Sequence, residues 1–166
     1  MLDNIQKSYI RKESIFGPDN YKPLPVVLSK AKGVWVWDVN DEKYIDMMSG
    51  YSAVSHGHAH PELLKVFHEQ SSRLSLTSRA FYTDTLGPYL ETITKMSNFE
   101  MCLPMNAGAE AVETAIKSSR RWAYRTKKVQ PNKAEIIVAE GNFHGRTTTI
   151  ISFSSDENSR GDFGPH

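Results

Sequence analysis

The chain has 166 residues, of which 39% are apolar and 23% charged, with 20 Lys and Arg residues against 19 Asp and Glu residues. This balance leaves no broad basic field that would attract nucleic acid, and no apolar stretch is long enough to cross a bilayer. The composition therefore predicts a soluble globular protein that binds neither nucleic acid nor a membrane.

The N-terminal residues and the single cysteine bear on the cellular compartment. Residues 1–14 mix acidic and basic side chains and contain no apolar core of a secretory signal, and they lack the Arg- and Ser-rich character of an organellar presequence. Cys102 stands alone in the apolar run Met101-Cys102-Leu103, which is typical of a structural thiol in a buried strand. We expect a cytoplasmic protein.

The first half of the chain predicts a small sheet followed by helices. Short strands are expected at Val26–Leu28, Val34–Trp37 and Tyr44–Met47, with turns at Gly33 and at Asn40-Asp41, which together form an antiparallel meander. Pro61 is expected to open a helix, and a second helix is expected from about Leu86 to Met96. The apolar side of the first helix would be formed by Leu63, Leu64, Phe67 and Leu74.

From residue 100 the pattern alternates between strand and helix. It predicts a strand at Glu100–Pro104, a helix from Gly108 to about Lys127 and a strand at Ala134–Ala139, with Ile150–Phe153 as a possible further strand. This order is typical of a βαβ unit and a mostly parallel sheet.

The start of the long helix is a candidate phosphate site. Asn106 is a favourable N-cap residue, and the small residues that follow it leave the first N–H groups of the helix open to a ligand. These groups lie at the positive end of the helix dipole and suit a phosphate. A plain helix start is the alternative interpretation.

A second motif follows the strand predicted at 134–139. Phe143 and Arg146 lie where a parallel strand ends and side chains meet ligands in open α/β sheets, and Gly141 and Gly145 allow the backbone to bend around them. The alternative is an ordinary turn with a buried Phe and a solvated Arg.

These residues belong to a wider resemblance. The chain resembles the class III aminotransferases, which depend on pyridoxal 5'-phosphate, and within them the ornithine aminotransferases. Two motifs are class-wide: Gly57-His58-Ala59-His60-Pro61 and Phe143-His144-Gly145-Arg146-Thr147. The ornithine branch is indicated by Asn20-Tyr21-Lys22-Pro23-Leu24-Pro25, by Tyr51 and by Thr77-Ser78-Arg79-Ala80-Phe81-Tyr82.

The resemblance implies a fold and its division into domains. It implies the N-terminal part of the type I fold of pyridoxal-phosphate-dependent transferases, with a small antiparallel meander and the start of a mostly parallel sheet domain. Residues 1–50 would form the N-terminal arm and the small-domain meander. Residues 51–166 would form the first part of the large cofactor-binding domain.

The resemblance also implies roles for six residues. The N–H groups of Gly108 and Ala109 would bind the cofactor phosphate, and Phe143 would stack on the pyridine ring. Arg146 would bind the α-carboxylate of ornithine. The other two would select the substrate, Tyr21 by hydrogen bonding near the α-amino group and Tyr51 by lining the channel so that the δ-amino group is presented.

The sequence departs from the family at two positions. Relatives commonly have Ser or Thr where this chain has Ala107, so that phosphate binding would depend more on backbone donors. His144 stands where ornithine enzymes often carry tryptophan and other class members carry histidine.

Three histidines, His56, His58 and His60, could share one face of a strand and bind zinc. No cysteine and no pattern of residues that would orient the ligands supports such a site, and in the family the His58 and His60 pair belongs to a structural loop. We therefore predict no metal.

The activity implied by the resemblance is transfer of the δ-amino group of ornithine to 2-oxoglutarate, in a homodimeric enzyme. No segment matches the family motifs for the Schiff-base lysine or for the acidic residue that pairs with the pyridinium nitrogen. We therefore expect an N-terminal portion that holds no catalytic residue and is inactive in isolation. The alternatives are another class III aminotransferase, acting on acetylornithine or an ω-amine, and a catalytically inert fragment or interaction module.

Overall fold

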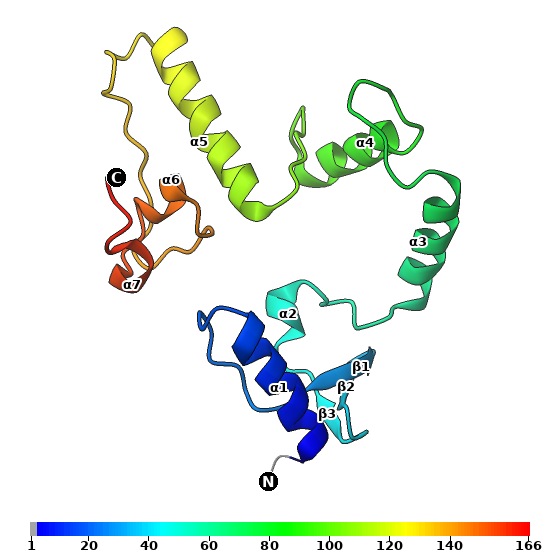
Figure 1. The fold of residues 1–166 in the computed structure, drawn as a ribbon. Helices are drawn as coiled ribbons and strands as arrows, with labels where there is room; N and C mark the ends of the chain where they lie inside the picture. The colour runs from blue at the N-terminus through cyan, green and yellow to red at the C-terminus, as the bar shows by residue number, and fades with distance from the viewer. Residues whose placement is uncertain (1–2) are drawn as a thin grey trace. The chain divides into compact units, whose positions relative to one another are not determined.

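The structure is a computed structural model that describes residues 3–166. Its contacts divide the chain into two units, Met1–Phe81 and Tyr82–His166, each described here by itself (Figure 1). Residues 1 and 2 of the expected N-terminal arm lie outside the described residues. The assignment of residues 1–50 and 51–166 to the two domains of the family fold stays a prediction.

The first unit begins with helix α1 (Asn4–Phe16), which the sequence analysis did not predict. Asp3 caps it, because its carboxylate accepts a hydrogen bond of 2.8 Å from the Gln6 N–H. Gln6 is the buried residue of this helix, and its side-chain amide donates to the Asp38 carboxylate at 3.0 Å. This pair attaches α1 to the sheet.

The sheet is the predicted antiparallel meander. Its strands are β1 (Leu28–Lys32), β2 (Trp35–Asp38) and β3 (Lys43–Ile45), in the order β1-β2-β3. Val36, which pairs with Ala31 on one side and Tyr44 on the other, is its buried apolar residue. The strands therefore begin one or two residues away from the predicted positions, while their number and pairing agree with the meander.

The Asp38 side chain closes the turn between β2 and β3. It is 2% exposed, and its carboxylate accepts hydrogen bonds from the backbone N–H groups of Asn40 and Glu42. The Tyr44 hydroxyl also donates to it, and the pKa of Tyr44 is raised, by desolvation first and by the Asp38 charge second. The turn is thus built around one buried carboxylate whose oxygens are satisfied by donors.

Two helices complete the first unit. α2 (Ser49–Ser52) is a short, strained turn, and α3 (Pro61–Arg73) starts at the proline that predicted it. The expected apolar side of α3 is not buried, which corrects the sequence-based expectation. Its residues are between 43% and 65% exposed because no described element packs against them: Leu63, Leu64, Phe67 and Leu74.

The second unit is built from four helices. α4 (Leu86–Ser97) and α5 (Gly108–Arg125) agree with the predicted helices, and α6 (Thr148–Ile151) and α7 (Glu157–Arg160) are single turns. Ile116 of α5 and both Ile150 and Ile151 of α6 are the buried apolar residues of this unit. Helices α5 and α6 are in contact, and this positions the loop preceding α6.

The strands expected after residue 100 are not formed among the described residues. Residues 100–104 and 134–139 have no regular secondary structure, and the stretch predicted as a strand from Ile150 begins instead inside α6. A parallel strand is stabilised by hydrogen bonds to neighbouring strands, and residues 3–166 supply no partner for these two segments. Cys102 is accordingly half-buried between an exposed Met101 and an exposed Leu103.

No helix in the described part of the chain is long and apolar enough to span a membrane.

Candidate functional site

The start of α5 is shaped by small residues. Ala107, in an extended conformation, is the N-cap, and no side chain caps the helix. Asn106 therefore precedes the cap, which corrects its predicted role; its own backbone N–H donates to the Glu110 carboxylate at 3.0 Å. The Glu110 carboxylate thus accepts a hydrogen bond from the residue before the N-cap and not from an N–H group of the helix.

The first N–H groups of α5 are available to a ligand. The N–H groups at the start of an α-helix have no acceptor inside the helix, and residues 3–166 supply none for Gly108 or Ala109. A Cβ built on Gly108 would meet no atom within 4 Å, so the space beside it is open. An anion such as a phosphate fits this arrangement of small residues, open space and unpaired donors.

The loop that carries Phe143 and Arg146 is held by polar contacts at its start. The side-chain amide of Asn142 donates to the carbonyls of Ala139 and Phe153, and the Gly141 N–H donates to the Ser155 hydroxyl at 2.8 Å. Gly141 has a φ of +69°, a left-handed conformation that favours glycine. The turn therefore has a defined shape.

Phe143 and Arg146 lie against each other at the exposed side of this loop. The Arg146 guanidinium carbon is 5.3 Å from the centre of the Phe143 ring, within the range of a cation–π contact, and Phe143 is 66% exposed. The ring of His144, between them in sequence, contacts Phe153 instead, with the ring centres 6.0 Å apart. The loop thus offers an aromatic face and a guanidinium side by side.

The loop is docked on the first turns of α5. A Cβ on Gly145 would come within 2.9 Å of the Ala109 Cβ, and the Thr147 hydroxyl donates to the Glu113 carboxylate at 2.6 Å. The two motifs singled out in the sequence are therefore neighbours in the second unit. The predicted site did not include Glu113 or Thr147. The signal that could have found this pair is the polar residue Glu113 one helical turn after Ala109 of the phosphate motif.

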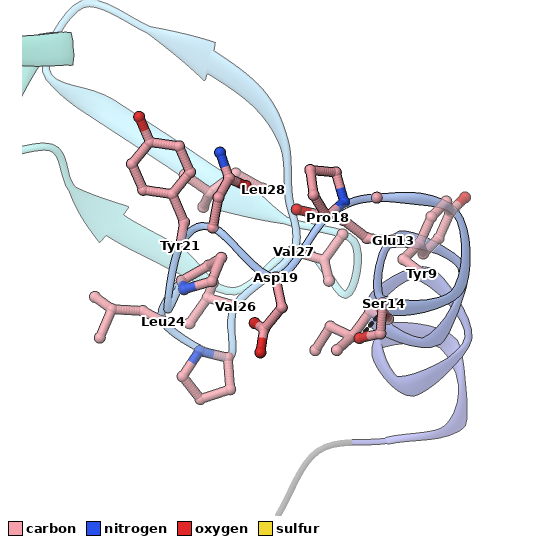
Figure 2. Close-up of a pocket in the computed structure, with 15 residues that line it drawn as sticks. Tyr9, Glu13, Ser14, Pro18, Asp19, Tyr21, Leu24, Val26, Val27 and Leu28 are labelled. Atoms are coloured by element: carbon pink, nitrogen blue, oxygen red, sulfur yellow. Dashed lines mark hydrogen bonds between the residues drawn. The ribbon is translucent and has the colours of Figure 1, made fainter. Parts of the chain in front are cut away.

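Tyr21 lies on the extended segment between α1 and β1. It lines a pocket of about 710 Å³ enclosed by α1 and residues 17–28, with Glu13 and Asp19 as its acidic residues (Figure 2). Figure 2 shows the Tyr21 hydroxyl directed away from α1, and the side chain is 58% exposed. The segment between α1 and β1 therefore directs the Tyr21 side chain away from α1.

Tyr51 lies in a turn of unusual backbone conformation. Ser49, Gly50, Tyr51 and Ser52 all have positive φ, which is unfavourable for residues other than glycine. The Tyr51 side chain is 87% exposed. A turn of this kind persists only where contacts impose it, and here these are backbone hydrogen bonds such as that from the Val54 N–H to the Ser49 carbonyl, together with the carboxylate of Asp46.

Asp46 holds the start of the Tyr51 turn and contacts His58. One carboxylate oxygen accepts hydrogen bonds of 2.9 Å from the N–H groups of Met48 and Ser49, and the other lies 2.7 Å from the His58 ring nitrogen Nε2. The His58 contact is the main reason that the pKa of Asp46 is lowered, followed by the backbone N–H groups. No sequence motif had pointed to Asp46.

The three histidines do not share one set of contacts. His58 pairs with Asp46 and its backbone bridges to Gly33, while the His56 and His60 rings meet edge to face at 6.2 Å. Among the described residues no group of three or more His, Cys, Asp or Glu side chains is arranged to hold a metal ion.

The six predicted site residues are divided between the two units. Gly108, Ala109, Phe143 and Arg146 are brought together in the second, whereas Tyr21 and Tyr51 belong to the first. The second unit therefore contains the part of the candidate site whose geometry is defined: a helix start suited to an anion beside an aromatic ring and a guanidinium.

Comparison with known proteins places this arrangement in context. Residues 16–166 match the family model described as "Aminotransferase class-III". The chain is 55% identical over 159 residues to ornithine aminotransferase of Bacillus cereus (strain Q1), covering 96% of this chain and 40% of the relative. It is 56% identical over 156 residues to ornithine aminotransferase of Brevibacillus brevis, covering 94% of this chain and 39% of the relative. The chain thus spans about 40% of the length of the curated relatives that it matches.

Two of the solved structures that are similar to it are the following. Ornithine aminotransferase of Toxoplasma gondii, described with partial occupancy of pyridoxal phosphate at its active site, superposes with a TM-score of 0.94 at 39% identity, over 96% of this chain and 38% of that one. Acetylornithine aminotransferase of Elizabethkingia anophelis superposes with a TM-score of 0.79 at 52% identity, over 92% of this chain and 38% of that one. These neighbours confirm the predicted fold class.

Proposed function

Because the chain belongs to the class-III aminotransferase family, we propose that the enzyme carrying this sequence is an ornithine δ-aminotransferase dependent on pyridoxal 5'-phosphate. It would convert ornithine and 2-oxoglutarate to glutamate-5-semialdehyde and glutamate. The observation that carries this proposal is the docking of the Phe143–Thr147 loop on the start of α5, through Gly145 against Ala109.

The residues of the second unit fit the cofactor. The N–H groups of Gly108 and Ala109 would donate to its phosphate, and Phe143 would stack on its ring, an aromatic contact worth about 0.5–1.5 kcal/mol beyond burial. When bound, the cofactor supplies the electron sink for moving an amino group, while the protein orients and surrounds it. Because Ala107 has no hydroxyl, the backbone donors carry the phosphate contact on this side.

The substrate would be recognised by three side chains. Arg146 would bind the α-carboxylate through two parallel N–H donors, a geometry that a lysine cannot reproduce. Tyr21 would hydrogen-bond near the α-amino group, and Tyr51 would line the channel so that the δ-amino group reaches the cofactor. We further propose a homodimer located in the cytoplasm.

A second candidate is an acetylornithine aminotransferase. The 52% identity to the Elizabethkingia anophelis protein of that name favours it, as does His144 in place of the tryptophan frequent in ornithine enzymes. The two candidates differ in the α-amino group, which is free in ornithine and acylated in acetylornithine. The test is kcat/KM for both substrates with 2-oxoglutarate, with the ornithine product identified as glutamate-5-semialdehyde; a preference for acetylornithine would reject the first proposal.

Variants of Tyr51 test the basis of the preference. Tyr51→Ile should lower kcat/KM for ornithine relative to an ω-amine such as γ-aminobutyrate by roughly 10- to 100-fold, because it widens the channel and removes a polar contact. Tyr51→Phe keeps the ring and separates the hydroxyl from the shape. An equal fall for both substrates in Tyr51→Ile would show that Tyr51 has only a structural role.

A further inference from the structure

The contact between Thr147 and Glu113 joins residues 34 positions apart in sequence. The Thr147 hydroxyl donates to the Glu113 carboxylate at 2.6 Å, a short hydrogen bond to a charged acceptor. Thr147 also caps α6, because its carbonyl accepts from the Ile151 N–H at 2.9 Å. One residue thus links the end of the Phe143 loop both to α5 and to the buried start of α6.

A second contact lies two residues earlier in the same loop. Gly145 has a φ of +127°, and a Cβ at this position would come within 2.9 Å of the Ala109 Cβ, so only glycine fits here against α5. Ala109 and Glu113 are four residues apart and therefore lie on the same face of the helix. The loop is fastened to one face of α5 at two points, one helical turn apart.

Arg146 lies between these two points. Its guanidinium packs on Phe143, at 5.3 Å from the ring centre, while its neighbours Gly145 and Thr147 both face α5. The distance from the aromatic ring and the guanidinium to the first N–H groups of α5 is consequently set by the two contacts. Gly145 and Ala109 limit how close the loop can come, and the Thr147 hydrogen bond limits how far it can move away.

We propose that Glu113 and Thr147 are positioning residues that hold Phe143 and Arg146 in register with the phosphate-binding start of α5. This inference rests on the proposed function, because the register matters only where one ligand is bound by both motifs. A ligand bound by its phosphate at α5 and by its ring on Phe143 loses contact at one end or the other if the loop is displaced. Precise placement of this kind is what binding and reaction rates depend on.

The test uses the full-length enzyme and paired variants of both residues. Thr147→Val and Glu113→Met remove the hydrogen bond at nearly constant size, whereas Thr147→Ser and Glu113→Gln keep a donor and an acceptor in place. Thr148→Val, the same change at the adjacent exposed threonine, is the matched control. The measurements are the dissociation constant of pyridoxal phosphate, the near-ultraviolet circular dichroism of the bound cofactor, and KM and kcat for the amino donor.

We expect Thr147→Val and Glu113→Met to weaken pyridoxal phosphate binding by roughly 5- to 20-fold, as loss of a hydrogen bond to a partly exposed charged group implies. The circular dichroism of the bound cofactor should change, because the ring partner has moved. Thr147→Ser, Glu113→Gln and Thr148→Val should stay within about twofold of the parent. The double variant should be no worse than either single variant, because the two residues form one contact.

Three results would overturn the proposal. The first is unchanged cofactor affinity and circular dichroism in Thr147→Val, and the second is additive losses in the double variant. The third applies even if a disrupting variant fails to fold. Thr147→Ser is compared with Thr148→Val, and Glu113→Gln with the parent, in their affinity for pyridoxal phosphate. Loss of that affinity in Thr147→Ser and Glu113→Gln would contradict the proposal. A parent enzyme that does not bind pyridoxal phosphate would instead refute the proposed function.

Discussion

At the scale of single residues, Asp46 allows a direct test of side-chain chemistry. Its pKa is lowered mainly by the hydrogen bond to His58, so the carboxylate form is favoured in the folded protein. A group with a lowered folded-state pKa contributes stability above its unfolded-state pKa, about 3.9 for Asp, and loses that contribution as pH falls through the folded value. The Tyr51 turn should therefore be held at neutral pH and released in acid.

The prediction is a carboxyl titration of Asp46 below the ordinary range, measured by NMR of labelled enzyme. His58→Leu should raise the midpoint toward the ordinary value, because a leucine has no N–H donor and the first cause of the shift is removed. Asp156, whose pKa is also lowered but through Ser159 and Asn158, is an internal control that should not respond. A midpoint of Asp46 that ignores the His58 change would contradict the assignment.

Arg146 permits a second prediction at the residue scale. In the full-length enzyme, Arg146→Lys should lower kcat/KM for ornithine by roughly 30- to 150-fold, because a two-point charge-assisted contact worth about 2–3 kcal/mol is lost. Pyridoxal phosphate affinity should fall far less, since the residue is assigned to the substrate. Arg125→Lys, near the end of α5, is the matched control. An unchanged kcat/KM would remove Arg146 from the site.

At the scale of elements, the start of α5 lacks an ordinary cap. Ala107 is the N-cap and has no side-chain acceptor, whereas Asp3 and Asp156 cap α1 and α7 through their carboxylates. In the full-length enzyme, Ala107→Ser should therefore raise the free energy of unfolding by about 1 kcal/mol, because its hydroxyl can accept from the first turn. Ala107→Val is the control without an acceptor. Equal melting temperatures for the two variants would show that the helix start needs no cap.

At the scale of the molecule, the stability of the isolated chain is limited by its small number of buried apolar residues. Val36 in the first unit and Ile116, Ile150 and Ile151 in the second are the buried apolar side chains among residues 3–166. Four such residues cannot offset the conformational entropy of ordering the chain. We therefore expect the 166-residue chain, expressed by itself, to unfold without a cooperative calorimetric transition, with the full-length enzyme as the control.

The same isolated chain should show no transamination of ornithine, since none of its segments matches the family motif of the cofactor-binding lysine. Incubation with pyridoxal phosphate followed by borohydride reduction and peptide mapping would test this. A single specifically labelled lysine together with measurable turnover would contradict it.

The sequence by itself determined the features that depend on local chemistry. Pro61 at a helix start, the glycine and Asn-Asp turns of the meander, and the small residues opening α5 could all be predicted because φ preferences and hydrogen-bonding groups act within a few residues. The pairing of the α5 start with the Phe143 loop was also predictable, because two motifs in succession indicated one ligand site.

Other features were decided only by tertiary structure. The apolar runs at 100–104 and 134–139 have strand character, but a strand requires a neighbour, and residues 3–166 provide none. Helix α1 depends on the buried contact of Gln6 with Asp38, and the Tyr51 turn depends on Asp46 and His58. The Glu113–Thr147 contact joins residues 34 apart. Contacts between distant residues leave no periodic or local pattern, because they arise only when folding brings the two segments together.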